Sequence, residues 1–328
     1  LSYGTFVERL ASNVQRATKH PVLLVTYGRS GSTFTSALIN HHKDVFFIFE
    51  PLVPLNLTST NYQKQNESTA IIRAFIECDF SLELSIFLDN FQFHYLQDTS
   101  EFYDCLLSKR SGIQHVSCYI KFLKDCQSHN TILVKTIRFR VSWAETFLKE
   151  NPQFKLLYLI RDPRATLFSQ AQLFNEFLWP SGIINASKTY CAILDDDLKE
   201  IVRLANLYPG RVKGIRYENG ATDPFTYTKD IYKFLGLGYD DQVASFIENI
   251  TTASADAPDV EGAYSVIRQN STQAMNKWRN KSDFESIRII DSICGFMYSK
   301  LGYKFVESHS DLRSSRDLFG SPELIIFQ

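Results

Sequence analysis

The stretch that decides the fold is Val22-Leu23-Leu24-Val25-Thr26-Tyr27-Gly28-Arg29-Ser30-Gly31-Ser32-Thr33-Phe34. Its first part, Val22–Tyr27, is an apolar, β-branched run that is typical of a buried parallel strand. A Gly/Ser turn follows, and from Ser32 to His41 the apolar residues recur at helical spacing. The free amides at the start of such a helix point outward and favour a bound anion. The stretch therefore predicts a strand, an anion-binding turn and a helix.

Strands and helices continue to alternate along the chain. A short helix is predicted before His20-Pro21, and residues from about 52 to 130 are less regular and are interpreted as a helical insertion over the sheet. The remaining strands are predicted at Val45–Phe49, Thr131–Phe139, Phe154–Ile160 and Val212–Tyr217. The remaining helices are predicted at Trp143–Glu150, from Asp162-Pro163 onward, at Ser187–Leu207, from Asp223-Pro224 to Gly236, and at Phe284–Lys300. This order predicts an α/β fold, a parallel sheet flanked by helices in a single domain 1–328 with a C-terminal tail at about 304–328.

The composition excludes several classes of protein. The chain has 328 residues, of which 44% are hydrophobic and 22% charged, so it is neither disordered nor a coiled coil. With 35 Lys+Arg against 36 Asp+Glu, its net charge of −1 argues against binding nucleic acid through bulk charge. No apolar run approaches the roughly 20 residues that span a bilayer. An anion site must therefore be built locally.

Three features concern the cellular compartment. The chain starts at Leu1, which indicates that an N-terminal segment was removed or left out. The six cysteines form no CxxC motif, which favours scattered disulfides over a zinc site, with free buried thiols as the alternative and no pairing fixed by the spacing. Asn-x-Ser/Thr triplets indicate a secretory-pathway glycoprotein, although chance placement also accounts for them. They begin at Asn56, Asn66, Asn185, Asn249, Asn270 and Asn280.

A second candidate anion-binding turn follows the strand that ends at Ile160. Arg161 stands at the strand end and Ser169 on the second turn of the next helix, so both side chains can reach one anion at the helix mouth. Ligands of parallel sheets bind beyond the carboxyl ends of the strands, where both turns lie. The first turn lacks the GxxxxGK[ST] pattern of nucleotide triphosphatases. For each turn the alternative is purely structural: a tight turn, a surface Arg or an exposed Ser.

The two turns, in this order, resemble those of the sulfotransferases that use 3′-phosphoadenosine 5′-phosphosulfate (PAPS). The chain is most similar to the Golgi carbohydrate 6-O-sulfotransferases, which modify Gal, GlcNAc or GalNAc, and whose signatures span about residues 20 to 303. The matching blocks are Gly28–Phe34, Phe49-Glu50-Pro51-Leu52, Cys78-Asp79-Phe80-Ser81, Leu159–Ala165, Arg216-Tyr217-Glu218, Trp278-Arg279 and Leu301-Gly302-Tyr303. The resemblance implies a P-loop-like sulfotransferase fold.

The resemblance also implies how PAPS, whose product is 3′,5′-bisphosphoadenosine, is bound. The 5′-phosphosulfate is expected at the first turn, through Arg29, Ser30, Gly31, Ser32, Thr33 and Phe34. The 3′-phosphate is expected at Arg161 and Ser169, and the adenine at Tyr217. Trp278 and Arg279 resemble a late loop that closes over the nucleotide. Tyr217 as a core residue and Trp278-Arg279 as a packing pair are the alternatives. No metal is needed.

Sulfuryl transfer needs one base and one cation. Glu50, at the end of the next strand among apolar neighbours, is the preferred base, and Arg29, where many relatives have Lys, stabilises charge without donating its proton. The alternative for Glu50 is a carboxylate that only pairs with Arg29 or Arg161, and rival bases are His20, His41 and His42.

Two basic residues of the predicted strand 131–139, Lys135 and Arg138, match a basic motif of the carbohydrate branch, and Arg140 follows the strand. By alternation, Arg138 and Arg140 share one face and Lys135 points the other way. All three are candidate ligands of an anionic or sulfated glycan, against the alternative of a solvated strand end.

We therefore expect a lumenal Golgi enzyme, tethered only through a missing N-terminal anchor, that sulfates the 6-hydroxyl of a hexose in a glycan or glycosaminoglycan. The alternatives are a protein-tyrosine sulfotransferase and an inactive glycan-binding relative. Two departures from the family pattern concern Asn219, where Asp is usual, and Val53-Pro54-Leu55, where Trp-His is frequent. The second lies near the expected acceptor and bears on the choice of sugar.

Overall fold

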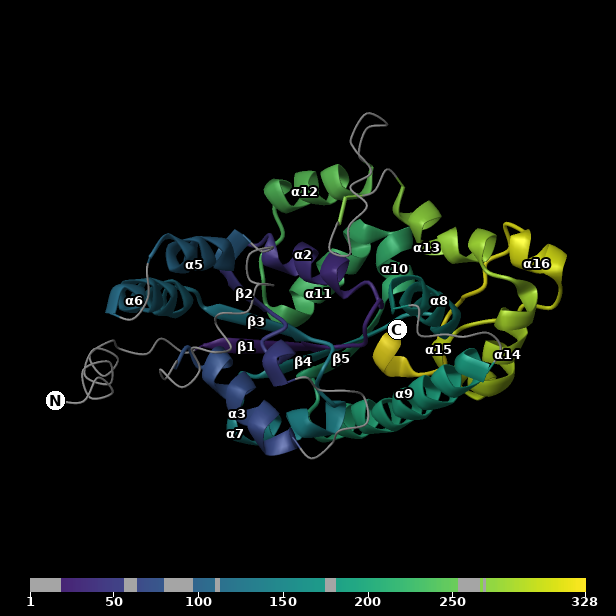
Figure 1. Cartoon of the computed structure of the whole chain (residues 1–328), viewed down its shortest axis with the longest axis horizontal. Coiled ribbons are helices and arrows are strands. Elements are labelled where there is room, and N and C mark those ends of the chain that lie inside the picture. Colours follow the sequence, from purple (N-terminus) through teal and green to yellow (C-terminus); the bar gives the residue numbers. More distant parts are fainter. Residues whose placement is uncertain are drawn as a thin grey trace. The chain divides into compact units, whose positions relative to one another are not determined.

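The structure is a computed structural model of the chain, shown in Figure 1 with its helices and strands labelled. It describes residues 19–55, 64–79, 97–109, 113–174, 181–252, 266–267 and 270–328. The helix predicted before His20 and the triplet at Asn56 lie outside these residues.

The core is a five-stranded sheet with the strand order β2-β3-β1-β4-β5. Its strands are β1 (His20–Val25), β2 (Val45–Phe49), β3 (Thr131–Thr136), β4 (Lys155–Ile160) and β5 (Val212–Arg216). Both β1 and β2 pair in parallel with β3, starting from His20 and Val45 opposite Thr131. Every residue of β2 and β3 is buried, which explains why β2 is a continuous apolar run and why the polar residues of β3 are confined to Thr131 and to Lys135 and Thr136. The predicted α/β class, a parallel sheet flanked by helices, is confirmed.

The chain divides into two compact units, each made of two separate segments. Unit 1 contains Leu1–Thr26 and Ile39–Leu157, and unit 2 contains Tyr27–Leu38 and Tyr158–Gln328. The boundary passes through β4 and through α2 (Ser32–Asn40). The expectation of a single domain stays a prediction.

In unit 1 each described part of the predicted insertion contains a helix. It contains η1 (Val53–Leu55), α3 (Gln65–Ile76), α5 (Gln97–Ser108) and α6 (Ile113–Ser128). The helices α5 and α6 lie side by side in Figure 1 and are joined by the disulfide Cys105–Cys118. A second disulfide, Cys78–Cys126, joins the end of α3 to the end of α6. η5 (Val141–Ala144) and α7 (Glu145–Glu150) complete the unit.

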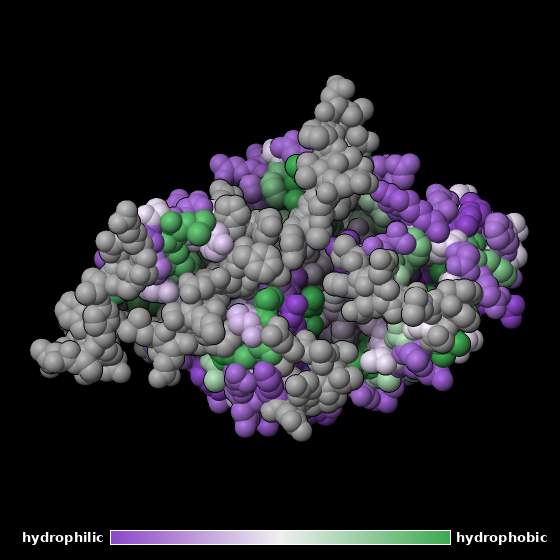
Figure 2. Space-filling view, in the orientation of Figure 1, coloured by the Kyte–Doolittle hydropathy of each residue, from purple (hydrophilic) through white to green (hydrophobic). Residues whose placement is uncertain are grey.

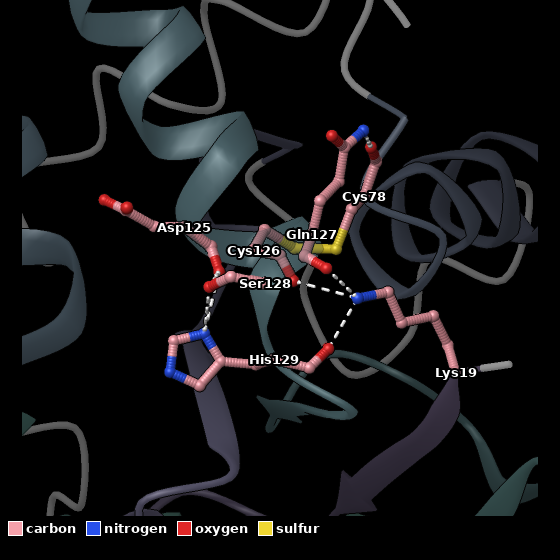
Figure 3. Close-up of a disulfide and its surroundings, with 7 residues drawn as sticks. All are labelled: Lys19, Cys78, Asp125, Cys126, Gln127, Ser128 and His129. Atoms are coloured by element: carbon pink, nitrogen blue, oxygen red, sulfur yellow. Dashed lines mark hydrogen bonds between the residues drawn. A yellow bond between two sulfur atoms is a disulfide. The ribbon is translucent and has the colours of Figure 1, made fainter. Parts of the chain in front are cut away.

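Lys19 connects the start of β1 to the C-terminus of α6. Its ammonium group donates hydrogen bonds to the carbonyls of Cys126, Gln127 and His129, beside the Cys78–Cys126 disulfide (Figure 3). Unsatisfied carbonyls concentrate at the end of a helix and attract a cation. Partial burial lowers the pKa of Lys19. The lysine therefore caps α6 and holds the chain where it enters the sheet.

Unit 2 is mainly helical, and its helix ends follow the sequence signals. In α11 (Pro224–Leu235), Asp223 accepts a hydrogen bond from the amide of Thr226 at 3.0 Å, and Gly236 ends the helix with a φ of 79°. Both features are as predicted for that helix. The predicted helix 284–300 consists of α14 (Phe284–Cys294), η6 (Gly295–Met297) and α15 (Tyr298–Leu301). The other helices are α8 (Pro163–Phe174), α9 (Ser181–Leu207), α10 (Tyr217–Thr222), α12 (Asp241–Thr251), α13 (Ser271–Lys281), α16 (His309–Arg313) and η7 (Ile325–Phe327).

A third disulfide, Cys191–Cys294, joins α9 to α14. All six cysteines are thus paired, which confirms the expectation of scattered disulfides. Residues 304–328, which the sequence suggested to be a tail, pack onto unit 2: Tyr303 pairs with Phe319 in a β-bridge, and Phe327 is buried against β5.

The surface of unit 2 over α13 and α16 is mainly hydrophilic (Figure 2). Of the helices that the structure describes, none combines the length and the apolar character required to cross a membrane.

The contact between Phe327 and β5 leads to a stability prediction. A methyl group at Gly214 would lie 2.6 Å from Cε1 of Phe327, so the buried ring has to move. We expect Gly214→Ala to lower the free energy of unfolding by about 1–3 kcal/mol, measured by denaturant unfolding. Gly320→Ala is the control, because a methyl group there meets only Cε of Lys304 at 3.9 Å. Equal stability of the two variants would contradict the packing described here.

Candidate active site

The turn after β1 is held in an unusual backbone conformation. Arg29 has a φ of 69° and Gly31 a φ of 85°, both in the left-handed region. Ser30 fixes the turn through its amide and its hydroxyl, which both donate to the carbonyl of Tyr27, at 3.3 and 2.7 Å. α2 begins at Ser32, so the amides of its first turn lie at the helix N-terminus, where an anion is favoured.

Gly31 is required because an aromatic ring lies directly on it. A methyl group at this position would approach Cδ2 of Tyr217 to 2.1 Å. Tyr217 is the first residue of α10, directly after β5, and its ring meets Phe34 edge-on at 6.1 Å. The sequence therefore needs a glycine here for both the backbone angle and the close approach.

The second turn lies against the first. Arg161 directly follows β4, and its Nη1 donates to the carbonyl of Arg29 at 3.0 Å. Its guanidinium also lies over the ring of Tyr217, 4.7 Å from the ring centre. Ser169, on α8, accepts a hydrogen bond from Nε of Arg29 at 2.9 Å. All four residues belong to unit 2.

Gln170 is a further contact of the first turn that sequence reasoning missed. Its side-chain amide donates to the carbonyl of Gly28 at 2.8 Å, one residue before the strained Arg29. Its position next to Ser169 was the only available signal.

The donors gathered here suit an anionic ligand. Arg29 and Arg161 supply two fixed positive charges, and Ser169 supplies a hydroxyl group. Nε of Arg161 is buried and has no hydrogen-bond partner among the described residues. A buried donor without a partner is costly, so a ligand acceptor at this point is favoured. The residues therefore fit a phosphorylated group.

Glu218 connects the two strand ends beneath this site. Its side chain is 3% exposed; Oε1 accepts from the amide of Asp162 at 2.9 Å, and Oε2 accepts from the hydroxyl of Tyr303 at 2.9 Å. Burial, together with repulsion from Asp162, raises the pKa of Glu218. The sequence placed this residue in the Arg-Tyr-Glu motif without assigning it a role.

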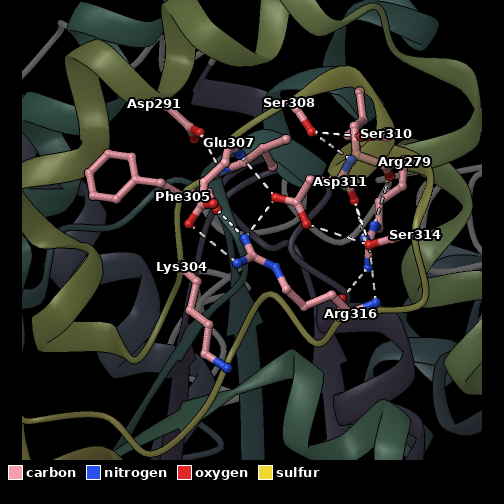
Figure 4. Close-up of polar contacts among 12 residues, drawn as sticks. Arg279, Asp291, Lys304, Phe305, Glu307, Ser308, Ser310, Asp311, Ser314 and Arg316 are labelled. Carbon is pink, nitrogen blue, oxygen red and sulfur yellow. Dashed lines mark hydrogen bonds and ion pairs between the residues drawn. The ribbon is translucent and has the colours of Figure 1, made fainter.

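Trp278 and Arg279 do not lie on a loop, as the resemblance suggested, but on α13. Arg279 donates to the carbonyls of Asp311, Leu312 and Arg316, at 3.0, 3.1 and 2.7 Å (Figure 4). Both side chains are 5% exposed. The alternative, a packing pair that holds α16 and the segment after it, accounts for these contacts, so we do not carry the two residues into the proposed cofactor site.

A separate cluster of charges surrounds Glu50 in unit 1. Glu50 follows β2, is 2% exposed and has a φ of 51°. Its Oε1 accepts from Nζ of Lys135 at 2.8 Å and from the amide of Ile137 at 3.0 Å. Its Oε2 accepts from Nη1 of Arg138 at 2.7 Å. Lys135 and Arg138 thus pair with Glu50, and the alternative that it pairs with Arg29 or Arg161 stays a prediction.

The expected orientation of the basic residues is wrong. β3 ends at Thr136, so the strand alternation does not extend to Arg138 and Arg140, and Lys135 and Arg138 converge on the same carboxylate. Lys135 is 3% exposed, with its ammonium group 4.2 Å from the ring centre of Phe49. Arg140 directly precedes η5 and is partly exposed.

The histidines that rivalled Glu50 are placed unfavourably. His20 is the first residue of β1, at the opposite end of that strand from the turn. His42 is 7% exposed, and its Nδ1 accepts from the amide of Asp44 at 3.1 Å. His41 follows the C-terminal end of α2, as expected from the sequence.

Backbone strain is a signal that sequence reasoning lacked. Among described residues other than glycine, a positive φ occurs at Arg29, Glu50 and Cys78. Cys78 is constrained by its disulfide, whereas Arg29 and Glu50 are the two residues for which the sequence suggested catalytic roles. Strained backbone concentrates at functional sites because the surrounding structure has to maintain it. In the described part of the chain, no group of three or more His, Cys, Asp or Glu is placed to hold a metal ion.

Comparison with known proteins identifies the family. Residues 21–241 match the model of the sulfotransferase family. The chain belongs to this family. Carbohydrate sulfotransferase 1 of Mus musculus is 26% identical over 92% of the chain and 83% of that protein. Carbohydrate sulfotransferase 6 of Homo sapiens is 25% identical over 89% of the chain and 83% of that protein. Among solved structures, mouse sulfotransferase SULT7A1 complexed with PAP is 16% identical, with a TM-score of 0.45 over 84% of the chain and 83% of that structure.

The contacts of Arg279 separate two interpretations of the Trp-Arg motif. We expect Arg279→Ala to lower the free energy of unfolding by about 2–4 kcal/mol, because buried carbonyls of residues 311–316 lose their donor. We expect the folded variant to bind 3′,5′-bisphosphoadenosine as the unchanged protein does, in isothermal titration. Loss of nucleotide affinity without loss of stability would restore the interpretation as a phosphate ligand.

Proposed function

We propose that the protein is a sulfotransferase that moves the sulfuryl group of PAPS to the 6-hydroxyl of a hexose (Gal, GlcNAc or GalNAc) in a glycan or glycosaminoglycan. The observation that carries the proposal is the pairing of the two turns, in which Arg161 donates to the carbonyl of Arg29 and lies over Tyr217. The relatives named carbohydrate sulfotransferases, which match about nine tenths of the chain, support a carbohydrate acceptor.

The cofactor is proposed to lie across the two turns. The amides of Gly31, Ser32 and Thr33 and the guanidinium of Arg29 hold the 5′-phosphosulfate, with Ser30 and Phe34 shaping the turn. Arg161, through its unpaired Nε, and Ser169 hold the 3′-phosphate. The ring of Tyr217, beside Gly31, contacts the adenine. PAPS supplies an activated sulfuryl group, whose transfer is an in-line displacement that depends on positioning and on charge stabilisation.

Glu50 is proposed as the base and Arg29 as the stabilising cation. The acceptor oxygen forms a bond to sulfur while its proton passes to Glu50, and the bond between sulfur and the 5′-phosphate oxygen breaks. Arg29 stabilises the charge left on that phosphate and keeps its own proton. Lys135, Arg138 and the amide of Ile137 hold the Glu50 carboxylate in one orientation. The strained φ of Glu50 supports a functional role for the residue.

Arg138 and Arg140 are the basic residues that we propose as acceptor ligands. The side chain of Arg138 is 24% exposed, so it reaches solvent while it pairs with Glu50. Lys135 is too deeply buried to contact a glycan and is proposed to act on Glu50 instead.

A lumenal Golgi location is proposed, and the surface of the chain is compatible with N-glycosylation. The asparagines of all five described triplets are exposed. Three disulfides also suit an oxidising compartment. The described asparagines are Asn66, Asn185, Asn249, Asn270 and Asn280.

The proposed cofactor is tested by ligand-induced stabilisation. We expect 3′,5′-bisphosphoadenosine at 100 times its dissociation constant to stabilise the protein by about 2.7 kcal/mol, measured as a shift in melting temperature. Arg161→Ala is expected to weaken this ligand by at least about tenfold and to leave the KM of the acceptor nearly unchanged, because a charged donor to the 3′-phosphate is lost. Equal loss for nucleotide and acceptor would contradict the assignment of Arg161.

The proposed base is tested with an isosteric variant and a set of acceptors. We expect Glu50→Gln to lower kcat by at least about 100-fold while the dissociation constant of 3′,5′-bisphosphoadenosine stays unchanged. Transfer of labelled sulfate to Gal, GlcNAc and GalNAc acceptors, followed by analysis of the product disaccharide, identifies the sugar and its hydroxyl. Transfer to a tyrosine peptide alone, or nucleotide-free glycan binding without transfer, would overturn the carbohydrate reaction. Near-normal turnover of the variant would exclude Glu50 as the base.

A further inference from the structure

Glu218 occupies a position that no catalytic or binding role of the proposed reaction explains. It stands directly after Tyr217, and its carboxylate accepts from the amide of Asp162, the residue directly after Arg161. The hydrogen bond thus joins Glu218 to Asp162, and the residues that precede these two, Tyr217 and Arg161, contact each other. β4 and β5, which precede these residues, are neighbours in the sheet.

The other carboxylate oxygen connects Glu218 to the C-terminal part of the chain. The hydroxyl of Tyr303 donates to Oε2 at 2.9 Å, and Tyr303 is 4% exposed. The C-terminal part of the chain also holds Arg216, the residue before Tyr217. Nη1 of Arg216 donates to the carbonyls of Leu301 and Gly320, at 2.7 and 2.8 Å. The C-terminal part of the chain therefore holds the Glu218 carboxylate through the hydroxyl of Tyr303.

Arg161 depends on such support because few contacts fix its guanidinium. Nη1 binds the carbonyl of Arg29, the plane lies over Tyr217, and Nε has no partner among the described residues. A long side chain that must meet a phosphate loses rotational freedom on binding, and that loss is smaller when its backbone and one face are already fixed. The hydrogen bond from the amide of Asp162 to Glu218 fixes the backbone next to Arg161. The ring of Tyr217 contacts one face of the Arg161 guanidinium.

We propose that Glu218 is a positioning residue, held by Tyr303, that sets the backbone after Arg161 and so aligns its guanidinium with the 3′-phosphate. The proposal rests on the proposed binding of PAPS. It adds that the C-terminal segment, through Tyr303 and Glu218, determines how strongly the enzyme recognises the 3′-phosphate.

The test measures the affinity gained from the 3′-phosphate, expressed as the dissociation constant of adenosine 5′-phosphate divided by that of 3′,5′-bisphosphoadenosine. We expect Glu218→Ala to reduce this ratio by about tenfold, and Tyr303→Phe, which removes one hydroxyl, to reduce it by about threefold. Glu218→Gln is expected to restore the ratio, because its oxygen accepts from Asp162 and its amide faces Tyr303. In an Arg161→Ala background, Glu218→Ala is expected to cause no further reduction.

Tyr298→Phe is the matched control for stability. It also removes a buried hydroxyl that donates to a carboxylate, Oδ1 of Asp291 at 2.8 Å. We expect it to lower the melting temperature as Tyr303→Phe does and to leave the ratio unchanged. An unchanged ratio in Tyr303→Phe and Glu218→Ala, or an equal reduction in Tyr298→Phe, would overturn the positioning role. A ratio near one in the unchanged protein would instead overturn the proposed cofactor site, so the two failures are distinguishable.

Discussion

Three arginines of unit 2 are almost completely buried, and the positive charge of each has to be matched inside the protein. Arg164, Arg216 and Arg279 are 0%, 4% and 5% exposed. A buried guanidinium without partners costs several kcal/mol, so the acceptors have to be supplied by structure that folds at the same time. Arg164 has carboxylates, Asp162 and Asp291, but all three arginines also donate to main-chain carbonyls of residues 301–316 or 320.

The C-terminal segment is for this reason an integral part of unit 2 and not an appendage. It supplies carbonyls to the arginines of the Arg-Asp-Pro-Arg, Arg-Tyr-Glu and Trp-Arg motifs, and in return those arginines fix a segment that has little regular structure. Asn219 takes part as well: its Oδ1 accepts from Nε and Nη2 of Arg216, at 3.1 and 2.7 Å, where the usual Asp would add a charge. Asn219, which departs from the family pattern, therefore still accepts two hydrogen bonds from Arg216 although it is neutral.

Much of the fold was predictable because local sequence determines it. The apolar run at Val45–Phe49 gave the strand with its bounds, and Asp223-Pro224 with Gly236 gave both ends of α11. The strand at Thr131 was predicted three residues too long, because Glu50 draws Arg138 and the amide of Ile137 out of the strand path, a long-range contact that alternation does not reveal. The disulfide pairings and the contacts of Arg279 also join segments that are distant in sequence. A motif identifies an arginine, but whether it meets a ligand or a carbonyl depends on what the rest of the chain places beside it.

The two residues with candidate catalytic roles, Arg29 and Glu50, both have strained backbone that substitution by glycine would relieve only with loss of their charge. Glycine would adopt the backbone at Arg29 and Glu50 without strain, yet it would remove the charge that the chemistry needs. The strain of a left-handed residue, about 1–2 kcal/mol, is offset locally in each case. At Arg29 the strain is offset by two hydrogen bonds: Arg161 donates to the carbonyl of Arg29, and Gln170 donates to the carbonyl of Gly28. At Glu50 the strain is offset by the hydrogen bond that its amide donates to the carbonyl of Lys135, at 2.8 Å, and by the ion pairs of its carboxylate with Lys135 and Arg138. A charged group held by strained backbone has one orientation, and a fixed orientation is what catalysis by positioning requires.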